Sequence, residues 1–232
     1  MDKATELKKL EVEIAADASL PLRGSNLVFG EGNPDCKALF IGEAPGKNED
    51  EQKRPFVGRA GQLLRGLIRE LGWKESEVYI TNIVKRRPPE NRDPSPEEIS
   101  AYRPYLTRQI EIIDPKVIVP LGRFSMHYFL PEAKISRDQG KVFRLGDPDA
   151  LYGGRGALIV PMFHPAAALR ATQALDALRE SFKKLPRIIE KAESGEMILM
   201  DLPPARPNDF GHSGGLTREN LKKPKPIQKG LF

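Results

Sequence analysis

Short uninterrupted apolar runs, separated by segments with helical spacing, constrain the fold of this chain most. Such runs occupy residues 38–41, 78–84 and 157–163, and a fourth lies within residues 114–122. A continuous apolar run is typical of a strand covered on both faces, as parallel strands are. The sequence therefore predicts an α/β fold, a three-layer α/β/α sandwich around a central, mainly parallel sheet of four strands.

The segments between these runs carry helix signals. Apolar residues of segment 58–71 recur at i, i+3, i+4, i+7, i+8 and i+11, which is one helical face. Pro96, followed by two glutamates, predicts a helix start, and that helix extends to about residue 113. Further helices are expected near residues 3–14 and 173–193, with short ones in 123–130 and 165–170, and a polar hairpin or insertion near 134–156.

Composition places the folded part in residues 1–194. Residues 195–232 are rich in proline, glycine and charge, which predicts a flexible basic tail. Of the net charge of +5, +4 falls within residues 217–232, so the rest of the chain is close to neutral and any basic patch must be local. No apolar run is long enough to span a membrane and no signal peptide is evident, so we expect a soluble cytoplasmic protein.

Unusual residues follow the predicted strands. Glu43 lies just after the first, Asn82 in the second, Gly122 after the third and His164 after the fourth. Ligands of open α/β sheets bind at the carboxyl ends of the strands. Each side chain alone is more often structural, but together they predict a site.

The loop after the first strand does not match the common phosphate-binding motifs. A Walker loop places four residues between its first glycine and the Gly-Lys pair, followed by Ser or Thr. Here three residues separate Gly42 from Gly46-Lys47, and Asn48 follows. The G-x-G-x-x-G dinucleotide motif is missing as well. The loop is not expected to bind a nucleoside triphosphate.

Four motifs in order, GEAPGKNEDEQKRPFVGRAGQLL, VYITNIVKRRPPENR, IVPLG and PMFHPAAALR, resemble those of the family 4 uracil-DNA glycosylases. The resemblance covers about residues 26–170. It implies an enzyme that flips uracil out of DNA and hydrolyses its N-glycosidic bond, leaving an abasic site in base excision repair.

By the same resemblance, Phe56 stacks on uracil, Asn82 reads its base-pairing edge and Glu49 crowds C5 to exclude thymine. The backbone around Gly42 and Ala44 contacts the base. His164 donates a hydrogen bond to uracil O2, where negative charge develops, and Glu43 orients or activates the attacking water. Asn91 is a further candidate near that water.

DNA contacts are expected from the basic loop and from the segment after His164. The loop residues are Lys85, Arg86, Arg87 and Arg92. Leu169 could fill the gap left by the extruded base, with Arg170 on a phosphate.

Family 4 enzymes carry an iron–sulfur cluster on four cysteines, and this chain departs from that pattern. The corresponding positions hold Ala15, Ala18, Arg86 and Tyr102, and Cys36 is the one cysteine of the sequence. One thiolate cannot hold a four-iron cluster. We therefore expect no cluster and no metal cofactor. Ala15, Ala18 and Tyr102 could instead pack the N-terminal segment onto the domain.

The end of the chain and the substrate range leave alternatives open. Gln228, Leu231 and Phe232 resemble the Q-x-x-L-F peptide that docks on the bacterial sliding clamp. We expect a monomer with uracil-containing DNA as its main partner. Two alternatives are a glycosylase for other deaminated bases, such as hypoxanthine, and a DNA-binding module that has lost turnover.

Overall fold

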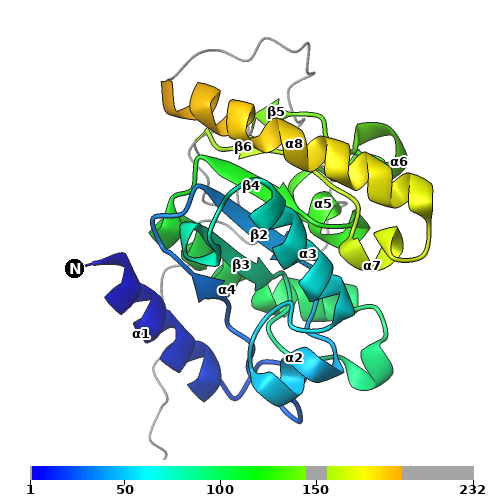
Figure 1. The fold of residues 1–232 in the computed structure, drawn as a ribbon. Helices are drawn as coiled ribbons and strands as arrows, with labels where there is room; N and C mark the ends of the chain where they lie inside the picture. Colours follow the sequence, from blue (N-terminus) through cyan, green and yellow to red (C-terminus); the bar gives the residue numbers. More distant parts are fainter. Residues whose placement is uncertain (1, 145–155, 195–232) are drawn as a thin grey trace, which may run out of the picture.

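Four parallel strands form the centre of the sheet, as the sequence predicts. They are β2 (Ala38–Gly42), β3 (Val78–Asn82), β4 (Val117–Pro120) and β6 (Leu158–Ile159). Their order across the sheet is β3-β2-β4-β6. The computed structural model of the chain describes residues 2–144 and 156–194, and Figure 1 shows helices on both faces of this sheet. The expected α/β/α fold is confirmed.

The sheet is wider than the predicted four strands. β1 (Glu31–Gly32) pairs antiparallel with β3 at one edge, and β5 (Phe143–Arg144) pairs antiparallel with β6 at the other. Within the described residues the sheet therefore has six strands. A two-residue strand is too short to show any periodicity, which is why the sequence did not reveal these edges.

Alternating side chains along the strands divide the core into two layers. Leu39, Ile41 and Ile118 face one cluster, while Phe40 and Val119 face the other. The first cluster packs against three helices: α1 (Lys3–Ala16), α4 (Pro96–Ile113) and α5 (Arg123–Phe129). The second packs against three others: α3 (Arg59–Glu70), α7 (Pro165–Ala168) and α8 (Thr172–Ser194). A side-chain period of two thus builds the three layers.

Helix ends follow the local capping signals. Ser95 and Glu98 form a reciprocal capping box at the start of α4, with Pro96 at the first helical position. Asp114, at φ 45°, ends that helix in the left-handed conformation. The remaining helical segments are α2 (Lys47–Gln52), α6 (Ile135–Asp138) and the 3₁₀ turns η1 (Glu75–Glu77) and η2 (Pro89–Asn91). The expected insertion near 134–156 contributes α6 and β5, and its residues 145–155 lie outside the described part.

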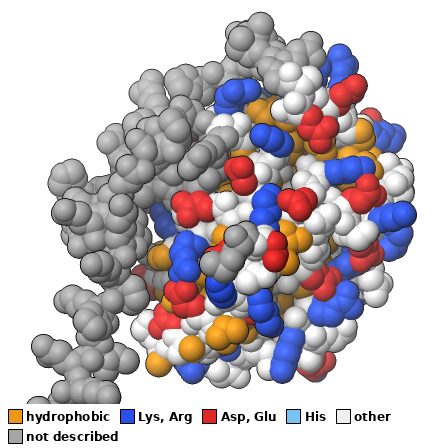
Figure 2. Space-filling view, turned by 90° about the vertical axis from the view of Figure 1, so that its left-hand side faces the viewer, with side chains coloured by type: hydrophobic (Ala, Val, Ile, Leu, Met, Phe, Trp, Pro, Cys, Tyr) orange, Lys and Arg blue, Asp and Glu red, His pale blue; other side chains and the backbone are white. Residues whose placement is uncertain are grey.

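The connections place a topological switch point at the carboxyl ends of two neighbouring strands. β2 and β4 are adjacent. The chain after β2 forms α2 and then α3, the chain after β4 forms α5, and α3 and α5 cover opposite faces of the sheet. Such a switch point is where open α/β sheets bind ligands. The opposite end of the molecule, seen in Figure 2, shows acidic and basic side chains intermixed. No helix within residues 2–144 and 156–194 is long and apolar enough to cross a bilayer.

Candidate active site

Strand register brings the predicted site residues to one edge of the sheet. Gly42, the last residue of β2, lies opposite Asn82, the last residue of β3. The Gly122 N–H donates to the Met162 carbonyl at 2.8 Å, so the segments after β4 and β6 lie side by side. His164 follows two residues later. A Cβ at Gly122 would lie 3.0 Å from His164 Cβ, so the glycine permits this close approach.

The lack of a side chain at Gly42 lets two others meet above the end of β2. A Cβ at this position would lie 2.4 Å from Asn82 Oδ1 and 2.5 Å from Phe56 Cζ. Both side chains are almost fully buried. The Phe56 ring centroid also lies 5.8 Å from that of His164, with the planes inclined by 32°. An aromatic ring, an amide and an imidazole therefore converge at one place on the rim.

The surroundings of His164 define its protonation state and its tautomer. The residue caps the N-terminus of α7, and its Nδ1 accepts a hydrogen bond from the Ala166 N–H at 3.2 Å. Burial lowers the pKa of the imidazole to about 4, although the charge of Glu49 opposes this shift. His164 is therefore neutral near pH 7. Because Nδ1 accepts, Nε2 carries the proton and is the free donor.

Glu43 is a partly buried carboxyl group with a shifted pKa. Burial raises its pKa to about 7; the charge of Asp93 adds to the shift and that of Arg123 reduces it. Arg123 also pairs with Asp93 at 2.6 Å. A carboxyl group that titrates near neutral pH suits general-base chemistry.

Glu49 holds the loop that carries Phe56, a role that sequence reasoning missed. Its Oε1 accepts hydrogen bonds from the backbone N–H groups of Val57 at 2.9 Å and Gly58 at 2.7 Å. Gly58 is the N-cap residue of α3, which has no side chain to cap the helix itself. The carboxylate therefore supplies the negative charge that a helix N-terminus favours.

Asn91 contacts the basic loop. It is exposed, at φ 54°, and its Oδ1 accepts a hydrogen bond from Arg87 Nε at 2.6 Å. Ala44 is partly buried and packs against the core beneath the rim. The backbone carbonyls of Gly42 and Glu43 each accept a bond from the chain after β3, which fixes this turn.

Two of the predicted DNA-binding residues are buried, which corrects their assignment. Lys85 has no exposed surface, and its Nζ donates to Thr81 Oγ1 at 2.6 Å and Gln109 Oε1 at 2.5 Å. Burial lowers the pKa of this ammonium well below its usual value. Arg86 is 8% exposed and donates to the Ser25 carbonyl at 2.5 Å. Lys85 therefore has no surface for a phosphate to contact, and Arg86 exposes only the small part that lines a surface pocket.

The other predicted DNA-binding residues lie at the surface. Arg87 is partly exposed, and Arg92 is exposed although both its Nη atoms donate to Glu98. Leu169, which ends α7, is 43% exposed, which is unusual for a large apolar side chain, and Arg170 beside it is also exposed. These side chains are available to a partner.

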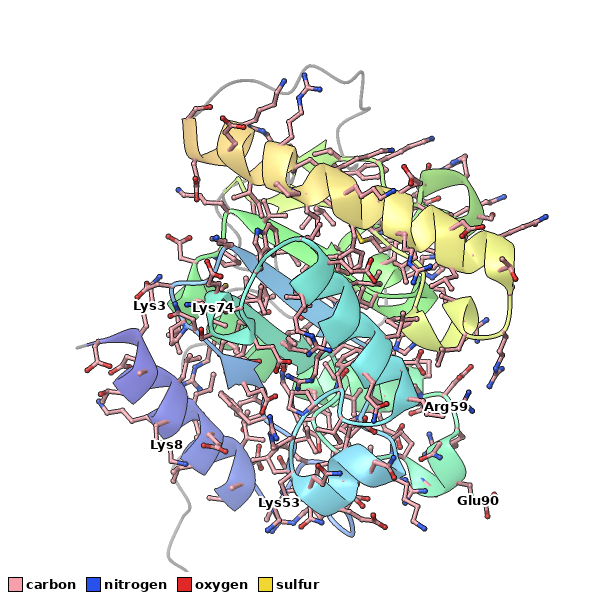
Figure 3. All side chains as sticks on the ribbon, viewed as in Figure 1. Lys3, Lys8, Lys53, Arg59, Lys74 and Glu90 are labelled. Carbon is pink, nitrogen blue, oxygen red and sulfur yellow. The ribbon has the colours of Figure 1, made fainter. Side chains whose placement is uncertain are left out.

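Sequence reasoning also passed over Arg59 and Arg123. Arg59 is the first residue of α3 and projects outward at the same end of the molecule as Glu90 of η2 (Figure 3). Arg123 begins α5 directly after Gly122 and is exposed. The sequence signal that could have identified them is their position, because each arginine is the first residue of a helix and directly follows the N-cap glycine of that helix.

The described residues offer no group suited to a metal ion. They contain no cluster of three or more His, Cys, Asp or Glu side chains with ligating geometry. Cys36 is partly buried, and this burial raises the pKa of its thiol to about 12, which disfavours the thiolate that metals bind.

Fold and site together define a class, an open α/β protein in which an aromatic, an amide and an imidazole side chain meet at the topological switch point. Residues 29–188 match the family model of the uracil DNA glycosylase superfamily. The chain is 44% identical to a type-4 uracil-DNA glycosylase of Sulfurisphaera tokodaii over 80% of this chain and 84% of that protein. It is 46% identical to that of Saccharolobus solfataricus over 76% and 80%, and 40% identical to that of Thermotoga maritima over 82% and 97%. The chain belongs to the type-4 uracil-DNA glycosylases of this superfamily.

Proposed function

We infer that the protein is a uracil-DNA glycosylase, which hydrolyses the bond between a flipped-out uracil and its deoxyribose in DNA repair. The observation that carries this conclusion is the meeting of Phe56, Asn82 and His164 at one rim. A flipped base needs contacts on its face and on its base-pairing edge, and these three side-chain types supply them.

We propose that Phe56 stacks on the uracil and that Asn82 reads its edge, with the backbone of Gly42 and Ala44 beneath. Uracil offers an acceptor at position 4 and a donor at position 3, whereas cytosine offers the reverse. A fixed amide satisfies only the first arrangement. The mismatch leaves buried groups unpaired at a cost of about 1–3 kcal/mol each. Glu49 is proposed to exclude thymine as well as to hold the loop.

His164 and Glu43 are proposed to carry the chemistry. As the glycosidic bond breaks, its electron pair goes to the uracil ring and negative charge develops at O2. The Nε2–H of a neutral His164 stabilises that charge more than the ground state, an effect of about 10²–10³ in rate. Glu43, titrating near pH 7, accepts a proton from the water that attacks the sugar carbon. Asn91 is proposed to help place this water.

DNA binding is proposed for the exposed residues of the rim. Arg87, Arg92 and Arg170 would contact phosphates, and Leu169 would fill the space that the flipped base leaves. A wedge must be accessible, and Leu169 is 43% exposed. Lys85 and Arg86 are not part of this surface.

Oligonucleotides that contain a single uracil test the function. The protein is incubated with single- and double-stranded forms, and abasic sites are revealed by alkali. Cleavage only at uracil supports the proposal. Cleavage at hypoxanthine would favour the wider specificity, and retention of labelled DNA without cleavage would favour a binding module.

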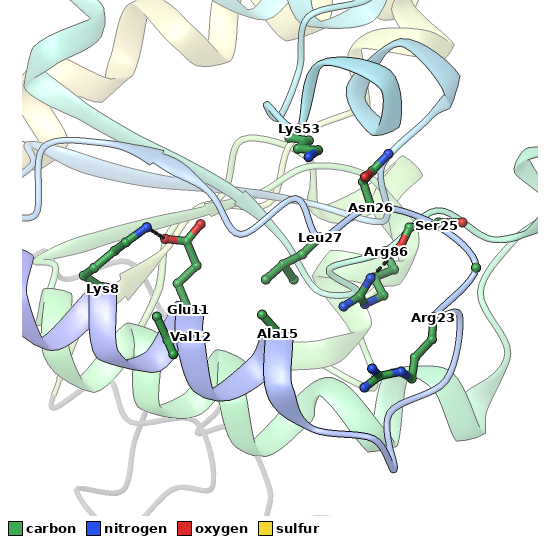
Figure 4. Close-up of a pocket in the computed structure, with 11 residues that line it drawn as sticks. Lys8, Glu11, Val12, Ala15, Arg23, Ser25, Asn26, Leu27, Lys53 and Arg86 are labelled. Atoms are coloured by element: carbon green, nitrogen blue, oxygen red, sulfur yellow. Dashed lines mark hydrogen bonds and ion pairs between the residues drawn. The ribbon is translucent and has the colours of Figure 1, made fainter.

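We propose that the iron–sulfur cluster of the family is absent. Of the four corresponding positions, Ala15 and Arg86 line one surface pocket (Figure 4). Tyr102 is buried, and its hydroxyl donates to the Pro21 carbonyl at 2.8 Å. A guanidinium and a phenol hold this region, and neither can ligate iron as a thiolate does.

The structure also corrects the expected packing there, because Ala15 and Ala18 are exposed. Tyr102 and Arg86, by contrast, each donate a hydrogen bond to a backbone carbonyl within residues 21–25. Iron analysis of the protein purified without chelators, with its visible absorption spectrum, tests the absence. Four irons per chain would contradict it.

We propose that residues 1–194 form the glycosylase domain, which acts as a monomer in the cytoplasm. The tail 195–232, with Gln228, Leu231 and Phe232, lies outside the described residues and is proposed to bind the sliding clamp. Removing the tail should preserve uracil excision and abolish co-elution with the clamp.

A further inference from the structure

Phe56 adopts a backbone conformation that its surroundings must enforce. Its φ is 53°, which lies in the left-handed region that residues other than glycine rarely adopt. Such conformations persist where neighbouring groups over-determine them, and they concentrate at functional sites. The position of the Phe56 ring therefore depends on the groups that hold this backbone conformation.

Arg65, on the helix that follows the loop, donates to two consecutive backbone carbonyls. Its Nε donates to the Phe56 carbonyl at 3.0 Å and its Nη2 to the Pro55 carbonyl at 2.9 Å. Its side chain is only 11% exposed. Because a guanidinium is planar and rigid, two such bonds fix the orientation of both peptide groups.

Two carboxylates form ion pairs with the Arg65 guanidinium. Arg65 forms ion pairs with Glu31 at the sheet edge and with Glu75 of η1. Arg54, in the same loop as Phe56, also donates to Glu31, at 2.7 and 3.1 Å. Although burial favours the protonated form of Glu31, the bonds from Arg54 and Arg65 lower its pKa below the usual value. The group is therefore ionised and keeps Arg65 in place near neutral pH.

The other side of the loop is closed by a tight backbone contact. A Cβ at Gly61 would lie 1.9 Å from the Phe56 carbonyl oxygen, so α3 touches the loop directly. Glu49 holds the next two N–H groups. Among these contacts, Arg65 provides the side-chain hydrogen bonds to the carbonyls of Pro55 and Phe56.

We propose that Arg65 is a positioning residue that holds the Phe56 ring in line with Asn82 and His164 for uracil recognition. The proposal rests on the proposed function of this rim. Arg65 itself touches no base; it acts through the backbone of Phe56. Its loss should therefore slow uracil excision only while the ring of Phe56 is present.

A double-mutant cycle on the full chain tests this dependence. Single-turnover rates of uracil excision are measured for wild type, Arg65→Met, Phe56→Ala and the double variant, together with melting temperatures. We expect Arg65→Met to slow excision about tenfold, within the range for coupled neighbours, and to have no further effect in the Phe56→Ala background. Arg69→Met is the matched control, because Arg69 lies one turn away and pairs with Glu75 at 3.1 Å without touching the loop.

Arg65→Lys separates positioning from charge. Lysine keeps the positive charge between Glu31 and Glu75 but cannot donate in a planar fork to two carbonyls. We expect it to preserve most of the melting temperature while excision remains slow, and it serves as the test variant if Arg65→Met does not fold. Rates equal to Arg69→Met, or an equal loss with and without Phe56, would overturn the proposal. A wild-type protein that leaves uracil in place would instead overturn the proposed function and this inference with it.

Discussion

Replacing Gly42 with alanine should disable the site without unfolding the protein. The new Cβ would lie 2.4 Å from Asn82 Oδ1 and 2.5–2.7 Å from two Phe56 ring carbons, whereas ordinary contacts begin at 3.4 Å. Both side chains must therefore move by about 1 Å. A misplacement of about 1 Å at a reacting centre can cost on the order of 10² in rate. We expect a loss of that order in single-turnover uracil excision, measured on a single-stranded oligonucleotide.

Stability should change much less, because Gly42 does not need a left-handed conformation and Ala is tolerated in a strand. Overpacking of a core typically costs about 1–3 kcal/mol, which leaves a folded enzyme whose melting temperature can be measured. Gly66→Ala is the matched control: it lies in α3, and a Cβ there would meet nothing within 4 Å. A Gly42→Ala enzyme as fast as Gly66→Ala would refute the reasoning.

Four further predictions concern the side chains of Glu43, His164 and Tyr102. Excision should slow as pH falls below the Glu43 pKa of about 7, and Glu43→Gln should be slow at every pH; an unchanged pH–rate profile in Glu43→Gln would contradict this. The raised pKa means that burial disfavours the Glu43 carboxylate, so its protonated form stabilises the fold at low pH and this stability is lost as pH rises through about 7. Glu43→Gln should therefore raise the melting temperature at alkaline pH more than at acidic pH. His164→Ala should lower the excision rate by about 10²–10³ at saturating enzyme, and a fall in DNA affinity alone would argue against transition-state stabilisation. Tyr102→Phe should cost about 0.5–1.5 kcal/mol in urea unfolding through its bond to Pro21, with excision unchanged; a loss of bound iron instead would show that a cluster is present.

The main elements of the fold could be predicted because their signals are local. Helix α4 begins and ends where its proline, capping box and apolar spacing indicate. The four central strands coincide with the apolar runs. Helix α2 was missed because its six residues carry no apolar face, and β1 and β5 because two residues have no period. In these segments tertiary contacts, not local preference, decide the structure.

The site could be predicted only where topology decides it. The order of strands and helices was enough to bring Asn82 and His164 to one edge, since parallel strands end together. It could not show that Lys85 and Arg86, in an apparently exposed basic loop, are buried under the N-terminal segment and α4. Nor could it show that Arg65, an ordinary cation on an amphipathic helix, turns onto the Phe56 loop.

From its sequence alone, then, this protein could be assigned a fold and a family, because periodicity and ordered motifs are properties of neighbouring residues. The tertiary structure decided which ionisable groups are charged near neutral pH and which of them DNA can contact. The charge of a side chain depends on how far distant segments remove it from water, and this desolvation makes His164 neutral, Glu43 titratable near pH 7 and Lys85 inaccessible to DNA.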